Sequence, residues 1–198
     1  MNLVIVGSGG ANIASLQAAL DRLNCKATLS TDADTIRAAS HVILPGVGAA
    51  ADAMARLREL SLDAVLRDLN QPVLGICLGM QLLAEASEED GAACLGLTED
   101  RAKLIRSGPD RAVPHMGWNT VAATRSSPLF TGIPDGSHFY FVHSYALPVS
   151  GSTIAQCEYG EPFAAAVQQG NYFGTQFHPE RSAKAGARLL ANFLALDA

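Results

Sequence analysis

Short apolar runs alternate with helix-like segments through the first half of the chain, and this alternation narrows the possible folds more than any other feature. The predicted strands are 3–6, 42–44 and 72–76, and the predicted helices are 12–23, 50–69 and 79–86. Strands that are apolar throughout are typical of a parallel sheet covered by helices on both faces. We therefore expect an α/β fold with a mostly parallel central sheet flanked by helices.

The second half of the chain predicts further strands rather than further strand–helix units. Short turns rich in Gly, Pro and Asn separate several of them, which indicates hairpins and therefore a mixed sheet. The predicted strands are 113–121, 139–145, 154–157, 163–168 and 172–177. A helix is expected at 179–196, and no repeat, low-complexity tract or linker divides the chain, so we expect one domain over 1–198.

The composition excludes several classes of protein. Of the 198 residues, 48% are apolar and 17% are charged, which is too apolar for a disordered chain. The formal net charge of −5 supplies no basic field for nucleic acid or an acidic membrane. No apolar run reaches the ~20 residues that span a bilayer, and the N-terminus lacks the basic flank of a signal peptide, so we expect a cytoplasmic protein.

Four cysteines are scattered along the chain without a Cys-x-x-Cys pair, at Cys25, Cys77, Cys94 and Cys157. This spacing argues against a structural zinc site and against a disulfide framework. A cysteine with a function here is therefore expected to act singly, as a thiol.

Cys77 has the strongest local context for a nucleophile. The segment Gly75-Ile76-Cys77-Leu78-Gly79 follows a predicted buried strand and opens a helix, as in a nucleophile elbow that carries cysteine in place of serine. The flanking residues of such a turn must be small, and the thiol then projects at the carboxyl end of the sheet. The alternative is that Cys77 is a small buried apolar residue, as most cysteines without a partner are.

A cysteine nucleophile needs a histidine as its base and usually a third group that orients the ring. Of the five histidines, His178 is the best candidate, because it lies where a strand is expected to end and is followed two residues later by Glu180. Glu180 could equally be an ordinary acidic residue in the first turn of a helix. With Cys77, the two residues complete a Cys–His–Glu set.

A tetrahedral intermediate also needs N–H donors directed at its oxygen. The amide of Leu78, directly after the nucleophile, is one candidate. The segment Pro45-Gly46-Val47-Gly48 could supply another, because its glycines allow a peptide group to turn over. A simple turn after the strand is the alternative for this segment.

These motifs resemble those of class I (triad) glutamine amidotransferases, which have a single-domain, flavodoxin-like α/β fold. The two signatures are Gly75-Ile76-Cys77-Leu78-Gly79-Met80-Gln81 and Gln176-Phe177-His178-Pro179-Glu180. Three more segments, 44–48, 115–119 (His-Met-Gly-Trp-Asn) and 139–145, are similar to the glutaminase subunits of imidazole glycerol phosphate synthases. The similarity extends over nearly the whole chain, with the segments in the expected order.

The resemblance implies a role for each matching residue. Cys77 would attack the side-chain amide of glutamine, His178 would protonate the leaving ammonia, and Glu180 would orient His178. The expected oxyanion residues are Gly46, Val47 and Leu78, with a Gly46–Val47 peptide that must reorient for activity. The expected glutamine-binding residues are Gln81, His143, Ser144 and Tyr145.

The resemblance also implies a partner, a cyclase subunit with a (β/α)8-barrel fold that forms a heterodimer with this chain. Ammonia would pass to the cyclase and react with a formimino-carboxamide nucleotide, giving imidazole glycerol phosphate and an aminoimidazole carboxamide nucleotide (AICAR) in histidine biosynthesis. The expected partner-facing residues are His115, Met116, Gly117, Trp118 and Asn119. No metal or organic cofactor is implied.

The residues alone leave alternatives open for these additional segments. Trp118 could be a core residue or part of a partner surface, and His143 on an apolar strand could be a satisfied core histidine. The stretch at 7–12 is Gly-Ser-Gly-Gly-Ala-Asn, where relatives usually carry an Asp-Tyr-Gly-x-Gly-Asn-like sequence. It also lacks the lysine and the spacing of a phosphate-binding loop.

Two other functional hypotheses remain at this point. The chain could be a different triad amidotransferase subunit, although those usually carry other residues at 45–48 and 115–119. It could also be a degenerate, non-catalytic binding module with this fold, although the intact Cys77, His178 and Glu180 argue against that.

Overall fold

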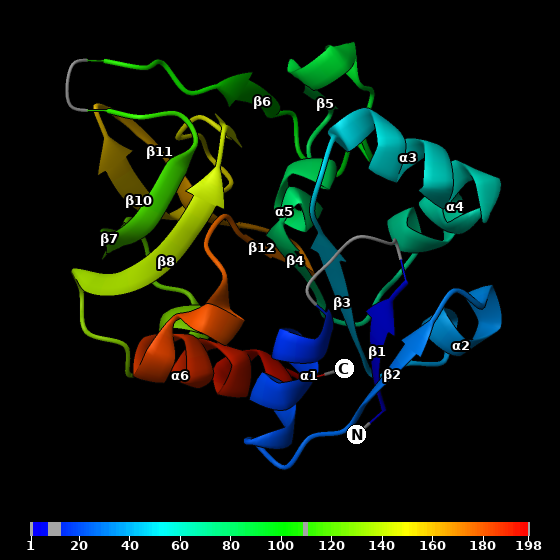
Figure 1. The fold of residues 1–198 in the computed structure, drawn as a ribbon. Helices are drawn as coiled ribbons and strands as arrows, with labels where there is room; N and C mark the ends of the chain where they lie inside the picture. Colours follow the sequence, from blue (N-terminus) through cyan, green and yellow to red (C-terminus); the bar gives the residue numbers. More distant parts are fainter. Residues whose placement is uncertain (1, 8–12, 109–110, 198) are drawn as a thin grey trace.

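The computed structural model describes residues 2–7, 13–108 and 111–197. Its central feature is one large twisted sheet with helices on both sides (Figure 1). The first five strands of this sheet run parallel, in the order β2 (Ala27–Ser30), β1 (Leu3–Val6), β3 (His41–Gly46), β4 (Val73–Cys77) and β12 (Tyr172–Thr175). This order is that of a flavodoxin-like sheet.

The remaining strands extend the sheet by antiparallel pairing. They follow β12 in the order β11 (Glu161–Gln169), β10 (Thr153–Tyr159), β7 (His115–Ala123) and β8 (Ser137–His143). The expected mixed sheet is therefore confirmed, and its antiparallel part lies to one side of the parallel strands (Figure 1).

The helices form two layers because the central parallel strands β1, β3 and β4 are buried on both faces. Leu3 and Ile5 of β1 face the layer of α1 (Ile13–Asp21) and α6 (Ala183–Leu194). Val4 and Val6 face the opposite layer. That layer is made of α2 (Ala33–Arg37), α3 (Ala50–Glu59), α4 (Leu62–Arg67) and α5 (Leu78–Leu82).

A second, smaller sheet lies beside the carboxyl ends of the parallel strands. It contains β5 (Ala86–Ser87), β6 (Arg101–Leu104) and β9 (Tyr145–Ala146). Three short 3-10 helices complete the described elements: η1 (Glu89–Gly91), η2 (Pro128–Phe130) and η3 (Pro179–Arg181).

Several expected boundaries were wrong. The helix expected at 50–69 is two helices, because Ser61 adopts a left-handed conformation (φ 55°) that turns the chain. The turn lets both Leu57 and Leu62 reach the core. The helix expected at 79–86 ends at Leu82, because Ala86 pairs with β6.

Other differences affect the site directly. The strand expected to end at 44 continues to Gly46, where β3 pairs with Cys77 of β4. The strand expected at 139–145 is two strands in different sheets, β8 and β9. The helix expected at 179–196 begins as η3 and becomes α6 only at Ala183, where the backbone has φ 48°. Strands β2, β5 and β6 and helix α2 were not predicted.

No helix in the described ranges is long and apolar enough to cross a membrane. The glycine-rich stretch at 7–12 departs from the family pattern. Its residues 8–12 lie outside the described part of the chain.

Candidate active site

Cys77 occupies the turn between β4 and α5, as expected for a nucleophile elbow. It is the last residue of β4, and its backbone has φ 55° and ψ −112°, a conformation that residues with a side chain rarely adopt. The positive φ directs the thiol away from the strand and into the cavity at the end of the sheet. The surrounding structure must hold this strained conformation in place.

The two glycines of the elbow are required by steric constraints. A Cβ atom on Gly79 would overlap the carbonyl group of Leu44 in the neighbouring strand β3. A Cβ atom on Gly75 would collide with the backbone of Gly79 and Met80. Helix α5 therefore contacts the ends of β3 and β4 directly, and this close contact fixes the position of Cys77.

His178 and Glu180 lie together in the segment that joins β12 to α6. Glu180 Oε1 is 2.8 Å from His178 Nδ1, and both side chains are almost completely buried. His178 is also tied to β8, because its backbone N–H donates to the Tyr140 carbonyl (2.9 Å) and its carbonyl accepts from Ser182 Oγ (2.7 Å). The imidazole ring is thus held by Glu180 from one side and by its backbone from the other.

The second ring nitrogen of His178 and the second carboxylate oxygen of Glu180 are buried without a hydrogen-bond partner among the described residues. Burial opposes a charge on His178, but Cys77 and Glu180 outweigh it and raise the pKa of His178 to about 10. With this raised pKa, the His178 ring takes up a proton readily. Because Glu180 holds Nδ1, Nε2 is the ring nitrogen that remains available.

Cys77, His178 and Glu180 line one cavity of about 340 Å³. The cavity is also lined by two expected oxyanion residues, Val47 and Leu78, together with Gly48 next to them. All four expected glutamine-binding residues line it as well: Gln81, His143, Ser144 and Tyr145. The fold thus converges on the triad and the expected glutamine-binding residues, although Cys77 and His178 are about a hundred positions apart.

The expected oxyanion residues lie directly beside the nucleophile. Gly46 is the β3 partner of Cys77 in the parallel register, and Leu78 is the first residue of α5. Val47 is 40% exposed, and Gly48 has φ 89°, so the chain turns sharply as it leaves β3. Val47 and Gly48 after β3 and Leu78 of α5 thus line the same cavity.

His143 and Tyr145 are joined at the cavity wall by a hydrogen bond between His143 Nδ1 and the Tyr145 carbonyl (2.9 Å). The same carbonyl accepts from Gln81 Nε2 (2.8 Å). Burial lowers the pKa of His143 to about 3, aided by the nearby His115 and His178, so His143 is neutral at ordinary pH. It serves as a hydrogen-bonding group in the wall rather than as a second base.

The structure adds residues that the sequence did not single out. Glu89, Val142 and Arg181 also line the cavity. Glu89 comes from η1, and its Oε2 accepts from the backbone N–H of Ala50 at 2.8 Å. Gln176 is completely buried next to the cysteine. Val142 and Gln176 lie in segments that resemble the family, 139–145 and 176–180, and Arg181 follows the second of them, whereas Glu89 had no sequence signal.

The expected partner-facing segment 115–119 forms the first part of β7, and its side chains alternate. Met116 and Trp118 are 64% and 52% exposed, whereas His115 is buried against His143. Trp118 packs edge-on against Tyr140 of β8, and the Arg181 guanidinium lies 4.8 Å from the centre of the Tyr140 ring. An exposed aromatic surface therefore lies close to the catalytic segment.

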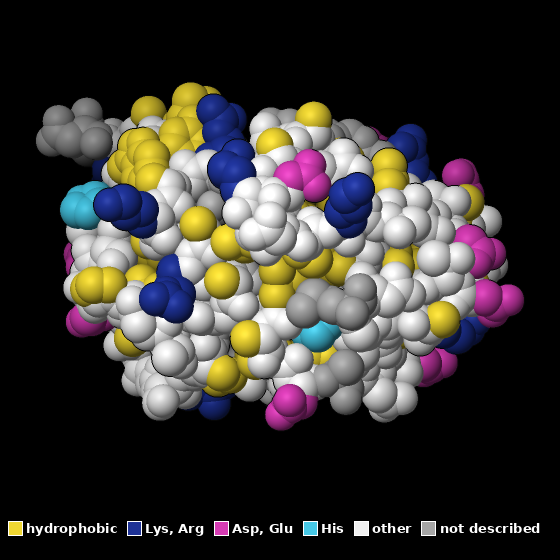
Figure 2. Space-filling view, turned by 90° about the horizontal axis from the view of Figure 1, so that it is seen from below, with side chains coloured by type: hydrophobic (Ala, Val, Ile, Leu, Met, Phe, Trp, Pro, Cys, Tyr) yellow, Lys and Arg dark blue, Asp and Glu magenta, His cyan; other side chains and the backbone are white. Residues whose placement is uncertain are grey.

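The face of the molecule drawn in Figure 2 is unevenly charged. Figure 2 shows hydrophobic side chains together with Lys and Arg toward the end that carries β7 and β8. Acidic side chains gather toward the opposite end.

The other cysteines lack the environment of Cys77. Burial raises the pKa of Cys157 to about 12 and also raises the pKa of Cys94. Both thiols therefore stay protonated, which suits small buried residues.

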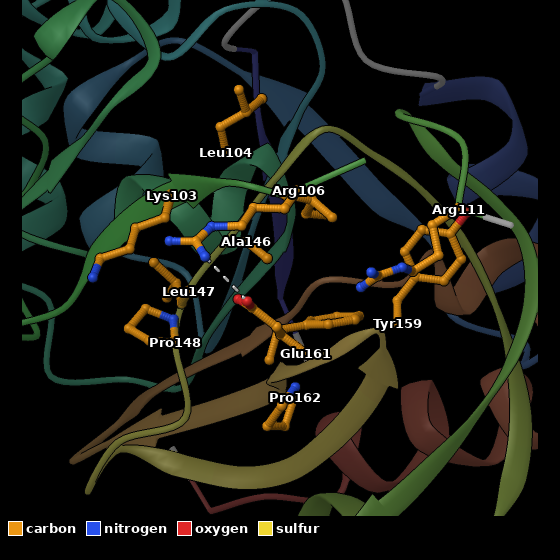
Figure 3. A pocket seen from close by; sticks show the side chains of 12 residues that line it. Lys103, Leu104, Arg106, Arg111, Ala146, Leu147, Pro148, Tyr159, Glu161 and Pro162 are labelled. Atoms are coloured by element: carbon orange, nitrogen blue, oxygen red, sulfur yellow. Dashed lines mark ion pairs between the residues drawn. The ribbon is translucent and has the colours of Figure 1, made fainter. Parts of the chain in front are cut away.

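A second cavity, of about 100 Å³, lies between β6, β9 and β11 (Figure 3). Lys103, Arg106 and Arg111 border it, and Arg106 Nη1 points toward Glu161 Oε1 at 3.5 Å. Both partners of this ion pair are largely exposed, and no cysteine or histidine lines the cavity. It offers no thiol beside a histidine, so the Cys77 cavity is the candidate active site.

Residues 4–196 match the family model for class-I glutamine amidotransferases. The chain belongs to this family. Within it, the chain is 52% identical to the imidazole glycerol phosphate synthase subunit HisH of Vibrio cholerae, over 98% of each chain. It is 53% identical to HisH of Escherichia coli O157:H7, over 98% of this chain and 99% of that one.

Solved structures agree with this assignment at the level of the fold. The glutaminase domain of a Trypanosoma brucei CTPS superimposes with a TM-score of 0.68 at 15% identity, over 100% of this chain and 95% of that one. A glutamine amidotransferase from Thermotoga maritima has a TM-score of 0.63 at 20% identity, over 98% and 82% of the two chains. The expected fold class is confirmed.

Proposed function

We propose that this chain is the glutaminase subunit of an imidazole glycerol phosphate synthase. It hydrolyses glutamine to glutamate and ammonia and passes the ammonia to a cyclase subunit. The observation that carries this proposal is the meeting of Cys77, His178 and Glu180 in one cavity, within a chain half identical to HisH subunits along its whole length.

The geometry supports a sequence of steps for the triad. His178 Nε2 takes the proton of the Cys77 thiol, and the thiolate attacks the carbonyl carbon of the glutamine side chain. The resulting imidazolium gives this proton to the leaving nitrogen, so ammonia departs and a thioester remains. His178 then activates a water that hydrolyses the thioester to glutamate, while Glu180 holds Nδ1 and stabilises the charged ring.

The oxyanion of each tetrahedral intermediate would be bound by backbone N–H groups. Leu78 supplies one of them, directly after the nucleophile. The Gly46–Val47 peptide supplies another after it reorients, which the glycines on either side of Val47 permit. This reorientation is the step that a partner could control.

The wall of the cavity would hold the amino-acid part of glutamine. The residues that would form its hydrogen-bonding surface line the same cavity as the triad: Gln81, His143, Ser144 and Tyr145. The carboxylate of Glu89 lies at the same cavity and supplies a negative charge for the α-ammonium group.

The β7 surface is the proposed contact with the partner. Met116 and Trp118 are large, exposed and adjacent on one face of the strand, as anchor residues of interfaces are. The other expected interface residues alternate with these two along β7: His115, Gly117 and Asn119. The partner would be a (β/α)8-barrel cyclase that forms a heterodimer with this single-domain chain in the cytoplasm. It would use the ammonia to form imidazole glycerol phosphate and AICAR, without a cofactor on this chain.

The test is glutamine hydrolysis by the purified chain, measured alone, with the barrel subunit, and with the barrel subunit and its nucleotide. We expect slow turnover alone and at least a ~100-fold increase in the full mixture, since the oxyanion peptide awaits the partner. Equal turnover in all three mixtures would contradict control by the partner. The absence of turnover in all three would contradict the glutaminase itself.

A further inference from the structure

Gln176 lies directly beneath the nucleophile, although the proposed mechanism gives it no part. It follows the last residue of β12, its side chain is completely buried, and its backbone N–H donates to the Ala165 carbonyl (2.9 Å). Its side-chain Nε2 is 3.7 Å from Cys77 Sγ, an ordinary separation for an N–H group that donates to sulfur.

The orientation of the Gln176 amide follows from its neighbours. Gln81 Nε2 is 2.8 Å from the Tyr145 carbonyl and 3.0 Å from Gln176 Oε1. A carbonyl oxygen can only accept, so the atom of Gln81 that faces Tyr145 must be its nitrogen. That nitrogen uses its second hydrogen on Gln176, which must present its oxygen there. The Gln176 nitrogen therefore faces Cys77.

A chain of hydrogen bonds fixes the Tyr145 carbonyl from its other side. His143 Nδ1 is 2.9 Å from this carbonyl and must carry a hydrogen, which leaves His143 Nε2 as an acceptor. His115 Nδ1 donates to that Nε2 at 3.0 Å, so His115 Nε2 is in turn an acceptor, 3.4 Å from Asn119 Nδ2. Asn119 Oδ1 accepts from the Thr120 backbone N–H (2.8 Å), which orients this amide as well. The direction of each hydrogen bond is thus fixed from Asn119 of β7 to the Tyr145 carbonyl at the cavity.

The charge state of the sulfur decides how much the Gln176 contact contributes. In the thiol form, Cys77 Sγ–H can donate to the Val142 carbonyl at 3.7 Å while it accepts from Gln176. When the proton moves to His178 Nε2, the bond to Val142 is lost, and the bond from Gln176 becomes one to a charged acceptor. Hydrogen bonds to charged groups are roughly twice as strong as neutral ones.

We propose that Gln176 is a further catalytic residue, whose side-chain N–H donates to the Cys77 sulfur and stabilises the thiolate. Gln81 and the Tyr145 carbonyl hold its amide in the donating orientation. The proposal rests on the proposed function only in taking Cys77 as the nucleophile.

The test is the rate at which iodoacetamide alkylates Cys77 at pH 7, followed by mass spectrometry of the Cys77 peptide. In this reaction the thiolate attacks the methylene carbon and iodide leaves, so the rate reports the fraction of thiolate. Gln176→Met keeps the length of the side chain and removes the donor. We expect alkylation about tenfold slower than in the wild type. A decrease smaller than about threefold would overturn the proposal.

Gln168→Met is the matched control, because Gln168 lies on β11 and contacts Ser127 (3.1 Å) away from the cavity. Its alkylation rate should equal that of the wild type, and an equal slowing in both variants would overturn the proposal as a loosening of the sheet. If Gln176→Met does not fold, the proposal can still be tested on the wild-type chain. The NMR signals of the Gln176 side-chain N–H should then shift with pH along the curve of Cys77 alkylation, and signals that do not shift would overturn the proposal.

Neither measurement needs glutamine or a partner subunit. A chain that fails to hydrolyse glutamine would therefore leave this result standing. A negative result for Gln176 would likewise leave the glutaminase standing.

Discussion

Glu180 Oε1 contacts His178 Nδ1 at 2.8 Å, and this contact determines which nitrogen of the ring is left for Cys77. Because the carboxylate accepts from Nδ1–H, Nε2 is the nitrogen that takes and returns the proton. The two residues are only two positions apart, so the turn that begins at Pro179 is enough to create this geometry.

Replacing Glu180 with glutamine should lower the turnover of glutamine while keeping the shape of the site. The amide cannot stabilise the imidazolium with a negative charge, and we expect kcat to fall by about 10²–10⁴-fold. The measurement is glutamine hydrolysis in the presence of the barrel subunit. Glu161→Gln is the control, because Glu161 pairs with the exposed Arg106 at the second cavity and should retain wild-type turnover. A loss below tenfold for Glu180→Gln would contradict the role of the carboxylate.

Gly79→Ala should destabilise the fold strongly. The added methyl group would overlap the Leu44 carbonyl, which is backbone and cannot move aside without shifting β3. We expect a loss of at least about 3 kcal/mol in the free energy of unfolding, measured by chemical denaturation. Gly151→Ala adds the same methyl group where nothing lies within 4 Å, and it should change stability little. Similar losses in the two variants would show that the close approach of α5 to β3 is not the cause.

The neutral His143 should make the protein less stable at low pH. Its pKa is about 3 in the folded chain, below the ordinary value of 6.5, so the unfolded chain binds more protons between these values. The stability that this residue contributes is present above pH 6.5 and is lost as the pH falls through that window. The slope is about 1.4 kcal/mol per pH unit for one proton.

This slope can be isolated with His143→Gln, which cannot titrate. Between pH 6 and pH 5 the wild type should lose about 1 kcal/mol more of its free energy of unfolding than the variant does. His138→Gln, at an exposed position of β8, should behave as the wild type. If the stability of His143→Gln fell as steeply as that of the wild type, the buried neutral histidine would not be the source.

Trp118→Ala should weaken binding of the barrel subunit without unfolding the chain. Trp118 is 52% exposed and packs only partly against Tyr140, so its remaining surface is free for a partner. We expect a loss of about 2 kcal/mol, or roughly 30-fold in Kd, by titration calorimetry. Leu104→Ala removes a side chain that is 53% exposed on β6, and it should bind normally. Equal effects of the two substitutions would place the interface elsewhere.

The elbow and the histidine motif could be predicted from the sequence because their geometry is local. Gly75 and Gly79 bracket Cys77 within five residues, and His178 and Glu180 lie in one turn. Most of the parallel half of the sheet was equally visible, since β1, β3 and β4 are largely apolar and are separated by helical patterns, whereas the partly polar β2 was missed.

The features that were missed depend on contacts between distant segments. The helical spacing of apolar residues continues through Ser61, so the local sequence does not predict the break between α3 and α4. Glu89 reaches the cavity from η1, and Gln176 reaches Cys77 from the end of β12, and these contacts exist only when the fold brings the elements together. The short strands of the small sheet likewise form because they find partners, not because their sequences require it.

The most direct test of the central claim is synthesis by the complex of Cys77→Ala with the barrel subunit, measured with glutamine and then with ammonium salts as the nitrogen source. If Cys77 releases ammonia for a reaction that takes place on the other subunit, glutamine-dependent synthesis is abolished and ammonia-dependent synthesis stays at the wild-type rate. Glutamine-dependent synthesis that survives the substitution, or ammonia that fails to restore product, would contradict the account.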